Sequence, residues 1–226
     1  MLDLYCERTS PDFWAEPVNA VTNLAFVLAA WMVWRLACRE RSLDTGIIAL
    51  IGLIVAISLG SFLFHTLASK LTRWLDILPI FIFQLLYLGL YCRRVIRLPV
   101  TPTCLSLLFF LLAALGASQF STHLNGSLIY APAWLVIVIL GWYHYRSEKA
   151  GRGLMLAAAG ILLISIALRS IDISVCSRFE SGTHFLWHVF NALVIYLVMQ
   201  VLILNIGGRL PVSKSCPALP VTESKV

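Results

Sequence analysis

Five residues stand out as able to carry chemistry, because of their types and spacing. His184 and His188 open an apolar segment, and a spacing of four residues places both imidazoles on one face of an α-helix. Ser61 and His65 share this spacing near the end of another apolar segment, and Asp76 opens the next one. Ionisable groups within a membrane are costly, so they usually face the interior of a helix bundle and mark a functional site.

The three histidines suit a metal ion. Three imidazoles with an open fourth position form a catalytic zinc arrangement, in which bound water has a pKa of about 7 and becomes a usable nucleophile. Each histidine also has a simpler explanation. The pair at His184 and His188 fits an interfacial polar pair that hydrogen-bonds to water or lipid headgroups, and His65 alone fits a buried, hydrogen-bonded histidine. His123 and His144 are expected at exposed loop or interface positions.

The elements that must position these residues are transmembrane helices. The chain has 226 residues, of which 60% are hydrophobic and 12% are charged, whereas soluble domains carry about 25% charged residues. An α-helix needs about 17 to 25 apolar residues to cross a bilayer. We therefore predict an all-α fold, a seven-transmembrane helix bundle with an interior zinc site, whose spans cover residues 17–37, 45–68, 76–92, 102–120, 129–145, 153–169 and 184–206.

The two ends of the chain lie outside this transmembrane domain of residues 17–206. Residues 1–16 form an acidic N-terminal segment that is too polar for a cleaved signal peptide, which needs a basic start and an apolar run. Residues 207–226 lack apolar periodicity, and we predict that they form a disordered cytoplasmic tail.

The distribution of lysine and arginine predicts the orientation, because cytoplasmic loops carry the excess of these residues. Of the 17 in the chain, 12 lie on the side of the C-terminus, and the N-terminal side holds the other 5, which are Arg8, Lys70, Arg73, Arg169 and Arg178. We therefore expect a multi-pass protein with its N-terminus outside, in a periplasm or lumen, and its C-terminus in the cytoplasm. This topology gathers the five candidate residues at the outer helix ends. The net charge of +6 reflects it, and favours no nucleic-acid partner.

Three stretches carry a resemblance to a known family. "YCERTSPDFWAEPVNAVTNLAF", "GSFLFHTLASKLTRWLDILPI" and "THFLWHVFNAL" resemble the alkaline ceramidase family, seven-transmembrane zinc amidohydrolases in a superfamily shared with adiponectin receptor-like proteins. The resemblance implies that His65, His184 and His188 hold a catalytic zinc, with Ser61 and Asp76 beside its water. The implied reaction cleaves the amide bond of ceramide, or of a similar membrane lipid, to a sphingoid base and a fatty acid.

The chemistry of amide hydrolysis suggests roles for Ser61 and Asp76. Asp76 is the best-placed general base, which takes the proton of water and returns it to the departing amine. The Ser61 hydroxyl can donate a hydrogen bond to the developing oxyanion. The alternative function is an adiponectin receptor-like zinc-binding receptor or scaffold with little or no hydrolase activity. This alternative is favoured if Asp76 is instead a fourth zinc ligand. A retinal protein is excluded, because residues 184–206 contain no lysine for a Schiff base.

A calcium site beside the zinc is a second implication of the resemblance. Glu7 and Glu16 match two of the family's calcium-binding positions, and calcium prefers such carboxylate oxygens. Leu4 and Thr9 depart from the pattern, since the family has an acidic residue and an amide there. The alternative is that the glutamates and Asp12 cap and solvate the start of the first helix, where negative charge is favourable.

Cysteines on the expected outer side raise the question of a disulfide. Cys6 and Cys176 both fall there, where an oxidising compartment permits a bridge. Related enzymes have a comparable link, and two free thiols are the alternative. Asp172, in the same outer connection as Cys176, is within possible reach of the site.

Overall fold

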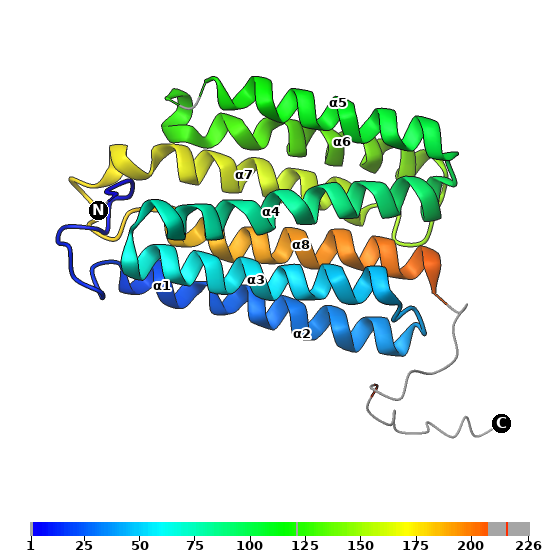
Figure 1. Cartoon of the computed structure of the whole chain (residues 1–226), viewed down its shortest axis with the longest axis horizontal. Helices are drawn as coiled ribbons and strands as arrows, with labels where there is room; N and C mark the ends of the chain where they lie inside the picture. Colours follow the sequence, from blue (N-terminus) through cyan, green and yellow to red (C-terminus); the bar gives the residue numbers. More distant parts are fainter. Residues whose placement is uncertain (1, 121, 208–215, 217–226) are drawn as a thin grey trace.

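The structure is a computed structural model that describes residues 2–120, 122–207 and 216 (Figure 1). Its described residues form helices and connections without a β-strand. The tail predicted over residues 207–226 lies outside the described residues, apart from Gly207 and Cys216. The elements, in chain order, are α1 (Pro17–Thr22), α2 (Leu24–Arg39), α3 (Thr45–Leu67), α4 (Lys70–Tyr91), the π-helix η1 (Cys92–Ile96), α5 (Val100–Ser118), the 3₁₀ segment η2 (His123–Tyr130), α6 (Ala131–Arg146), α7 (Leu154–Val175) and α8 (His184–Ile206).

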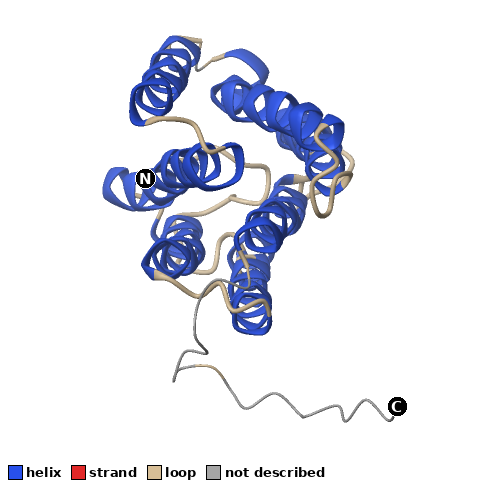
Figure 2. Ribbon diagram, turned by 90° about the vertical axis from the view of Figure 1, so that its right-hand side faces the viewer, coloured by secondary structure: helices blue, strands red, loops and turns tan. Residues whose placement is uncertain are grey.

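The helices form one bundle with seven stretches that are long and apolar enough to cross a membrane. The N-terminal segment and the α7–α8 connection lie at the same end of the bundle, on the left in Figure 1. Figure 2 views the helices almost end-on. Helix α8 is the most enclosed span: 50% of the residues in its most apolar stretch are buried, whereas 11% are buried in the corresponding stretch of α5. The lipid-facing character of α5 is seen at Phe109, which is 73% exposed. This pattern is that of a multi-pass membrane protein.

Two helices extend further than hydropathy predicts, both at the end that carries the N-terminal segment. Helix α4 begins at Lys70, six residues before the predicted start, because Ser69 and Thr72 form a reciprocal capping box. Helix α7 continues to Val175 instead of ending at residue 169, because Arg169 and Asp172 are buried within the bundle. Charged side chains at the start of α4 and at the end of α7 resemble those of loops, which is why the sequence predicts shorter helices.

The first span is divided at Asn23 into α1 and α2. The Asn23 carbonyl accepts a hydrogen bond from Ser58 of α3 at 2.8 Å. The Asn23 amide donates to the carbonyl of Asn19 at 2.9 Å. Because α3 holds this junction, the short helix α1 has a fixed position at the end of the bundle where the candidate residues lie.

Disulfides join distant segments at both ends of the bundle. Cys6 and Cys176 are bridged, with their Cα atoms 5.5 Å apart. The sequence had left open whether these two cysteines form a disulfide or remain free thiols. Cys38 and Cys216 are also bridged, at the opposite end. The first bridge fastens the N-terminal segment to the end of α7, beside the three histidines.

Candidate metal centre

The structure brings together the three histidines that the sequence singled out. His65 lies in the last turn of α3, whereas His184 and His188 lie in the first two turns of α8. Each is at most 2% exposed. One ring nitrogen from each histidine lies within 4.8 Å of the other two, and the Nε2 atoms of His65 and His188 are 3.2 Å apart. This cluster combines histidines more than 100 residues apart in the sequence.

Hydrogen bonds at the Nδ1 atoms show that this nitrogen carries a proton in two of these histidines. Nδ1 of His65 lies 2.6 Å from a carboxylate oxygen of Glu16, which can only accept, so this nitrogen donates. Nδ1 of His188 lies 2.9 Å from the Thr22 hydroxyl. That hydroxyl already donates to the Val18 carbonyl at 2.8 Å, so it accepts from His188. In the neutral rings, both Nε2 atoms then present a lone pair.

Two lone pairs that face each other at 3.2 Å repel unless a proton or a metal ion lies between them. His184 also needs a partner, because its buried Nδ1 has no hydrogen-bond partner among the described residues. Imidazoles whose far nitrogens are held by other groups, as those of His65 and His188 are, are typical of metal-binding histidines. The donor set fits zinc, for which imidazole is a common ligand.

Glu16 orients His65 and is itself held by Arg8. It is 2% exposed, and its two oxygens accept hydrogen bonds from Arg8 Nε at 2.5 Å and from His65 Nδ1. Burial by itself raises the pKa of Glu16, but the bonds from His65 and Arg8 outweigh it and hold this pKa below its usual value. Glu16 is therefore a carboxylate at neutral pH.

Glu7 caps helix α1. Its two carboxylate oxygens accept hydrogen bonds from the backbone N–H groups of Val18 and Asn19 at 2.7 and 2.9 Å. These groups belong to the first turn of the helix, where orphan donors and the helix dipole favour a carboxylate. The structure thus places Glu7 in the capping role and Glu16 beside His65, and neither carboxylate is left without partners.

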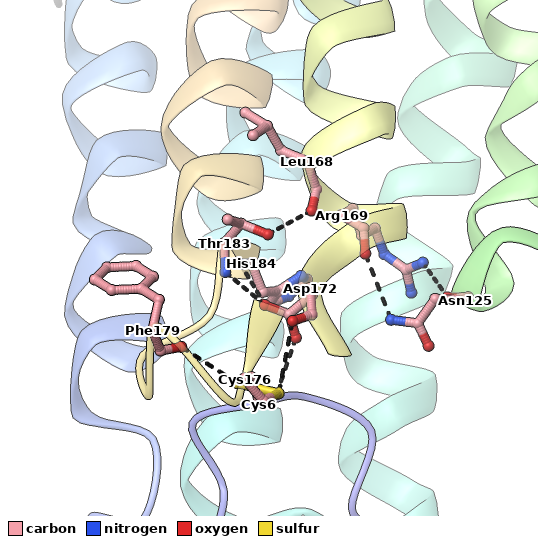
Figure 3. The surroundings of a disulfide bond; sticks show 9 residues. All are labelled: Cys6, Asn125, Leu168, Arg169, Asp172, Cys176, Phe179, Thr183 and His184. Atoms are coloured by element: carbon pink, nitrogen blue, oxygen red, sulfur yellow. Dashed lines mark hydrogen bonds between the residues drawn. A yellow bond between two sulfur atoms is a disulfide. The ribbon is translucent and has the colours of Figure 1, made fainter. Parts of the chain in front are cut away.

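Asp172 fixes the start of α8 rather than joining the histidines as a ligand (Figure 3). It is fully buried, and its Oδ1 accepts from the backbone N–H groups of Thr183 and His184 at 2.7 and 2.8 Å. Its Oδ2 accepts from the N–H of Cys6 at 2.9 Å. A side chain at Gly182 would place its Cβ 2.2 Å from Asp172, so this glycine is required. Asp172 therefore positions His184.

Ser61 and Asp76 meet where α3 and α4 touch. A Cβ at Gly60 would lie 2.0 Å from the carbonyl oxygen of Leu75, so only glycine allows this approach. It brings the buried Ser61 hydroxyl close to the partly exposed Asp76 carboxylate, with His65 nearby. The potential metal donors gathered among the described residues are the three histidines, without Asp76.

Tyr5 and Arg169 belong to the site, although the sequence did not single them out. The ring of Tyr5 stacks on His184, with centroids 3.6 Å apart and planes 13° from parallel. Arg169 donates to the Tyr5 hydroxyl at 3.3 Å and lies over the rings of Tyr130 and Trp187. Arg169 is the last residue of the predicted span 153–169, and only its position three residues before Asp172, on one helix face, gave a signal.

An apolar cavity lies among the helices next to this site. Aromatic and aliphatic side chains line it, with the Asn191 amide among them. Tyr130 and Trp187 form part of its wall and also contact Arg169, so they join the cavity to the histidine cluster. Leu140 and Val198 line it further along α6 and α8. Its apolar lining suits a hydrocarbon chain.

The remaining two histidines lie elsewhere. His123 lies at the start of η2. His144 was expected at an exposed loop or interface position, but it is fully buried near the end of α6. Its two ring nitrogens contact the Tyr91 hydroxyl at 2.7 Å and the Ala150 carbonyl at 2.9 Å. Hydrogen bonds to both nitrogens make burial possible, and the sequence does not reveal these partners.

Comparison with known proteins agrees with the geometry. The family profile described as Ceramidase matches residues 5–207, which include every residue of the cluster and residues 5–16 of the N-terminal segment. A search of curated proteins gives no match. Because the profile covers nearly the whole chain, this protein belongs to the ceramidase family and is a ceramidase-like hydrolase.

Proposed function

We propose that this protein is an integral-membrane, zinc-dependent amidohydrolase that cleaves the amide bond of ceramide, or of a similar lipid amide, to a sphingoid base and a fatty acid. One observation carries the proposal: the facing Nε2 atoms of His65 and His188 lie in a buried cluster beside an apolar cavity. Membership of the ceramidase family supports a hydrolase with a lipid substrate.

His65, His184 and His188 would hold the metal. When bound, zinc polarises a carbonyl and supplies hydroxide near neutral pH. Glu16 and Thr22 keep the two Nε2 lone pairs directed at the same point, and Tyr5 keeps the ring of His184 in place by stacking. These supports reduce the reorganisation that ligand binding would otherwise require.

Asp76 would transfer the proton of water, and Ser61 would stabilise the negative charge that develops on the carbonyl oxygen. A water oxygen adds to the amide carbonyl carbon while the Asp76 carboxylate takes a proton from that water. The C–N bond then breaks as Asp76 returns the proton to the amine nitrogen. The Ser61 hydroxyl donates a hydrogen bond to the carbonyl oxygen as negative charge develops there. A nucleophilic serine is disfavoured, because the ring nitrogens of His65 and His188 are engaged by Glu16, Thr22 and the metal.

The apolar cavity supports a substrate with a long hydrocarbon chain. Burying such a chain is favourable at about 25 cal/mol per Å². The amide at the polar end of the chain would lie near Trp187, close to the histidines. A substrate that enters from the bilayer keeps its chains in apolar surroundings throughout.

The orientation is also a proposal. The site lies at the end of the bundle with fewer lysines and arginines, which the excess of positive charge at the other end assigns to the outside.

Hydrolysis by a matched pair of variants tests the proposal. Asp76→Asn keeps the shape of the side chain but cannot take a proton, so we expect turnover of ceramide to fall by about 10²-fold or more. Zinc content should stay at the wild-type level. Release of sphingoid base and fatty acid is measured by mass spectrometry, with Asp3→Asn, an exposed aspartate of the N-terminal segment, as control.

Two outcomes would contradict these assignments. If Asp76→Asn loses zinc, Asp76 is a ligand and the proposed base is wrong. If the zinc-loaded wild-type protein releases no product from ceramide, dihydroceramide or phytoceramide, the receptor-like or scaffold alternative replaces the hydrolase.

A further inference from the structure

Arg8 is a buried cation surrounded by oxygen atoms. It is 4% exposed, although it belongs to the N-terminal segment. Its guanidinium donates to a carboxylate oxygen of Glu16 at 2.5 Å, to the carbonyl of His65 at 2.7 Å and to the carbonyl of Ser10 at 3.3 Å. One carboxylate and two carbonyls are also the kind of ligands that calcium prefers.

The two glutamates that the resemblance assigns to calcium have their oxygens engaged in other contacts. The second oxygen of Glu16 accepts from His65 Nδ1 at 2.6 Å and from the Asn19 amide at 3.1 Å. Both oxygens of Glu7 accept from backbone N–H groups of α1. Calcium needs about six to eight oxygen ligands. A second cation beside Arg8 would also meet like-charge repulsion in a region of low dielectric constant. The residues present do not fit a calcium ion.

Arg8 supports His65 in two ways. Through Glu16, it fixes the carboxylate that receives the proton of His65 Nδ1. Directly, it binds the His65 carbonyl, which lies in the last turn of α3, where carbonyl groups lack helical partners. A positive charge at this helix end also complements the helix dipole. Orientation of the His65 ring therefore depends on Arg8.

We propose that the Arg8 guanidinium is a built-in replacement for the second metal ion, so that the N-terminal segment holds His65 in place without calcium. Arg8 is a positioning residue, and this inference rests on the proposed function in that His65 is taken to be a metal ligand. It deepens that function by naming what sets the geometry of the ligand.

A calcium titration of the full-length wild-type protein is the first test. The unfolding temperature of the zinc-loaded protein is measured with calcium chloride and, separately, with equal concentrations of magnesium chloride. We expect the two series to coincide. A rise that is specific to calcium and grows with its concentration overturns the proposal, because a ligand that binds only the folded state must stabilise it.

Arg8 variants are the second test. Arg8→Gln removes the charge, so we expect zinc affinity to fall about 10- to 100-fold, the effect typical of losing a group that supports a metal-binding histidine. Arg8→Lys keeps the charge without the planar fork, so its loss should be smaller. Arg178→Gln, at an exposed arginine of the same end, should bind zinc as the wild type does. Wild-type zinc affinity in Arg8→Gln overturns the proposal.

A spectroscopic measurement separates positioning from general stability. In the cobalt-substituted protein, the visible spectrum reports ligand geometry, and we expect it to change in Arg8→Gln but not in Arg178→Gln. An unchanged spectrum in Arg8→Gln counts against the proposal. If Arg8→Gln does not fold, the zinc affinity of Arg8→Lys and the calcium titration of the wild type still test the proposal. None of these measurements uses a lipid, so a failure of hydrolysis and a failure of this inference are distinguishable.

Discussion

At the scale of single residues, function depends on which ring nitrogen of each histidine carries its proton. Glu16 settles this for His65 and Thr22 settles it for His188, so both Nε2 atoms are left to face a metal. The sequence predicts the histidines, because their spacing on helices is regular. It does not predict Thr22, since a threonine in an apolar helix has many possible roles and only the packing of α1 against α8 reveals this one.

Removing the acceptor of His188 should weaken metal binding. In Thr22→Val the methyl group cannot accept the Nδ1–H, so we expect about 10-fold weaker zinc binding, the lower end of the usual range for such supporting groups. Thr22→Ser keeps the hydroxyl and should bind zinc as the wild type does. Affinity is measured by competition with a chromophoric chelator. Equal affinity in Thr22→Val and wild type would show that this hydrogen bond does not set the tautomer.

At the scale of elements, the site depends on close contacts between helix ends. Helices α3 and α4 touch at Gly60, and this contact sets Ser61 beside Asp76. Hydropathy predicts that both helices exist, but it places the start of α4 six residues too late, because Lys70 and Arg73 resemble loop residues. The close approach itself has only one sequence signal, a glycine directly before Ser61, and a single glycine is a weak signal.

Gly60→Ala should separate the two helices. The new Cβ would lie 2.0 Å from a backbone oxygen, which cannot move as a flexible side chain does. We expect a loss of about 1–3 kcal/mol in unfolding free energy and a larger loss of turnover. Gly52→Ala on the same helix is the control, because its Cβ meets nothing within 4 Å and alanine favours helix. A Gly60→Ala protein with the stability and turnover of the wild type would contradict this account of the contact.

At the scale of the whole molecule, the candidate site and most of the positive charge lie at opposite ends of the bundle. The candidate site lies at one end, and nine lysines and arginines of the described residues lie at or beside the connections of the other end. Composition and hydropathy were sufficient to predict the all-helical fold and the seven spans, because each span must satisfy its own backbone in lipid. They were insufficient for Arg169 and Asp172, whose burial depends on partners from η2 and from the N-terminal segment.

The orientation can be tested with introduced cysteines. Glu180→Cys places a thiol in the α7–α8 connection, and Glu148→Cys places one in the α6–α7 connection at the opposite end; both positions are exposed. In intact cells, a membrane-impermeant maleimide should label Glu180→Cys and spare Glu148→Cys, with the unmodified protein as background. The reverse pattern would place the site on the cytoplasmic side and contradict the orientation inferred from charge.

The central claim is that the three histidines hold a catalytic zinc, and the metal content of the purified protein tests it most directly. Elemental mass spectrometry of the detergent-purified wild type, after exposure to zinc, should find about one zinc per chain. His188→Ala, which removes one of the two facing Nε2 atoms, should lose most of that zinc while it stays folded by circular dichroism. A folded wild-type protein without zinc, or a His188→Ala variant that keeps all of it, would contradict the account.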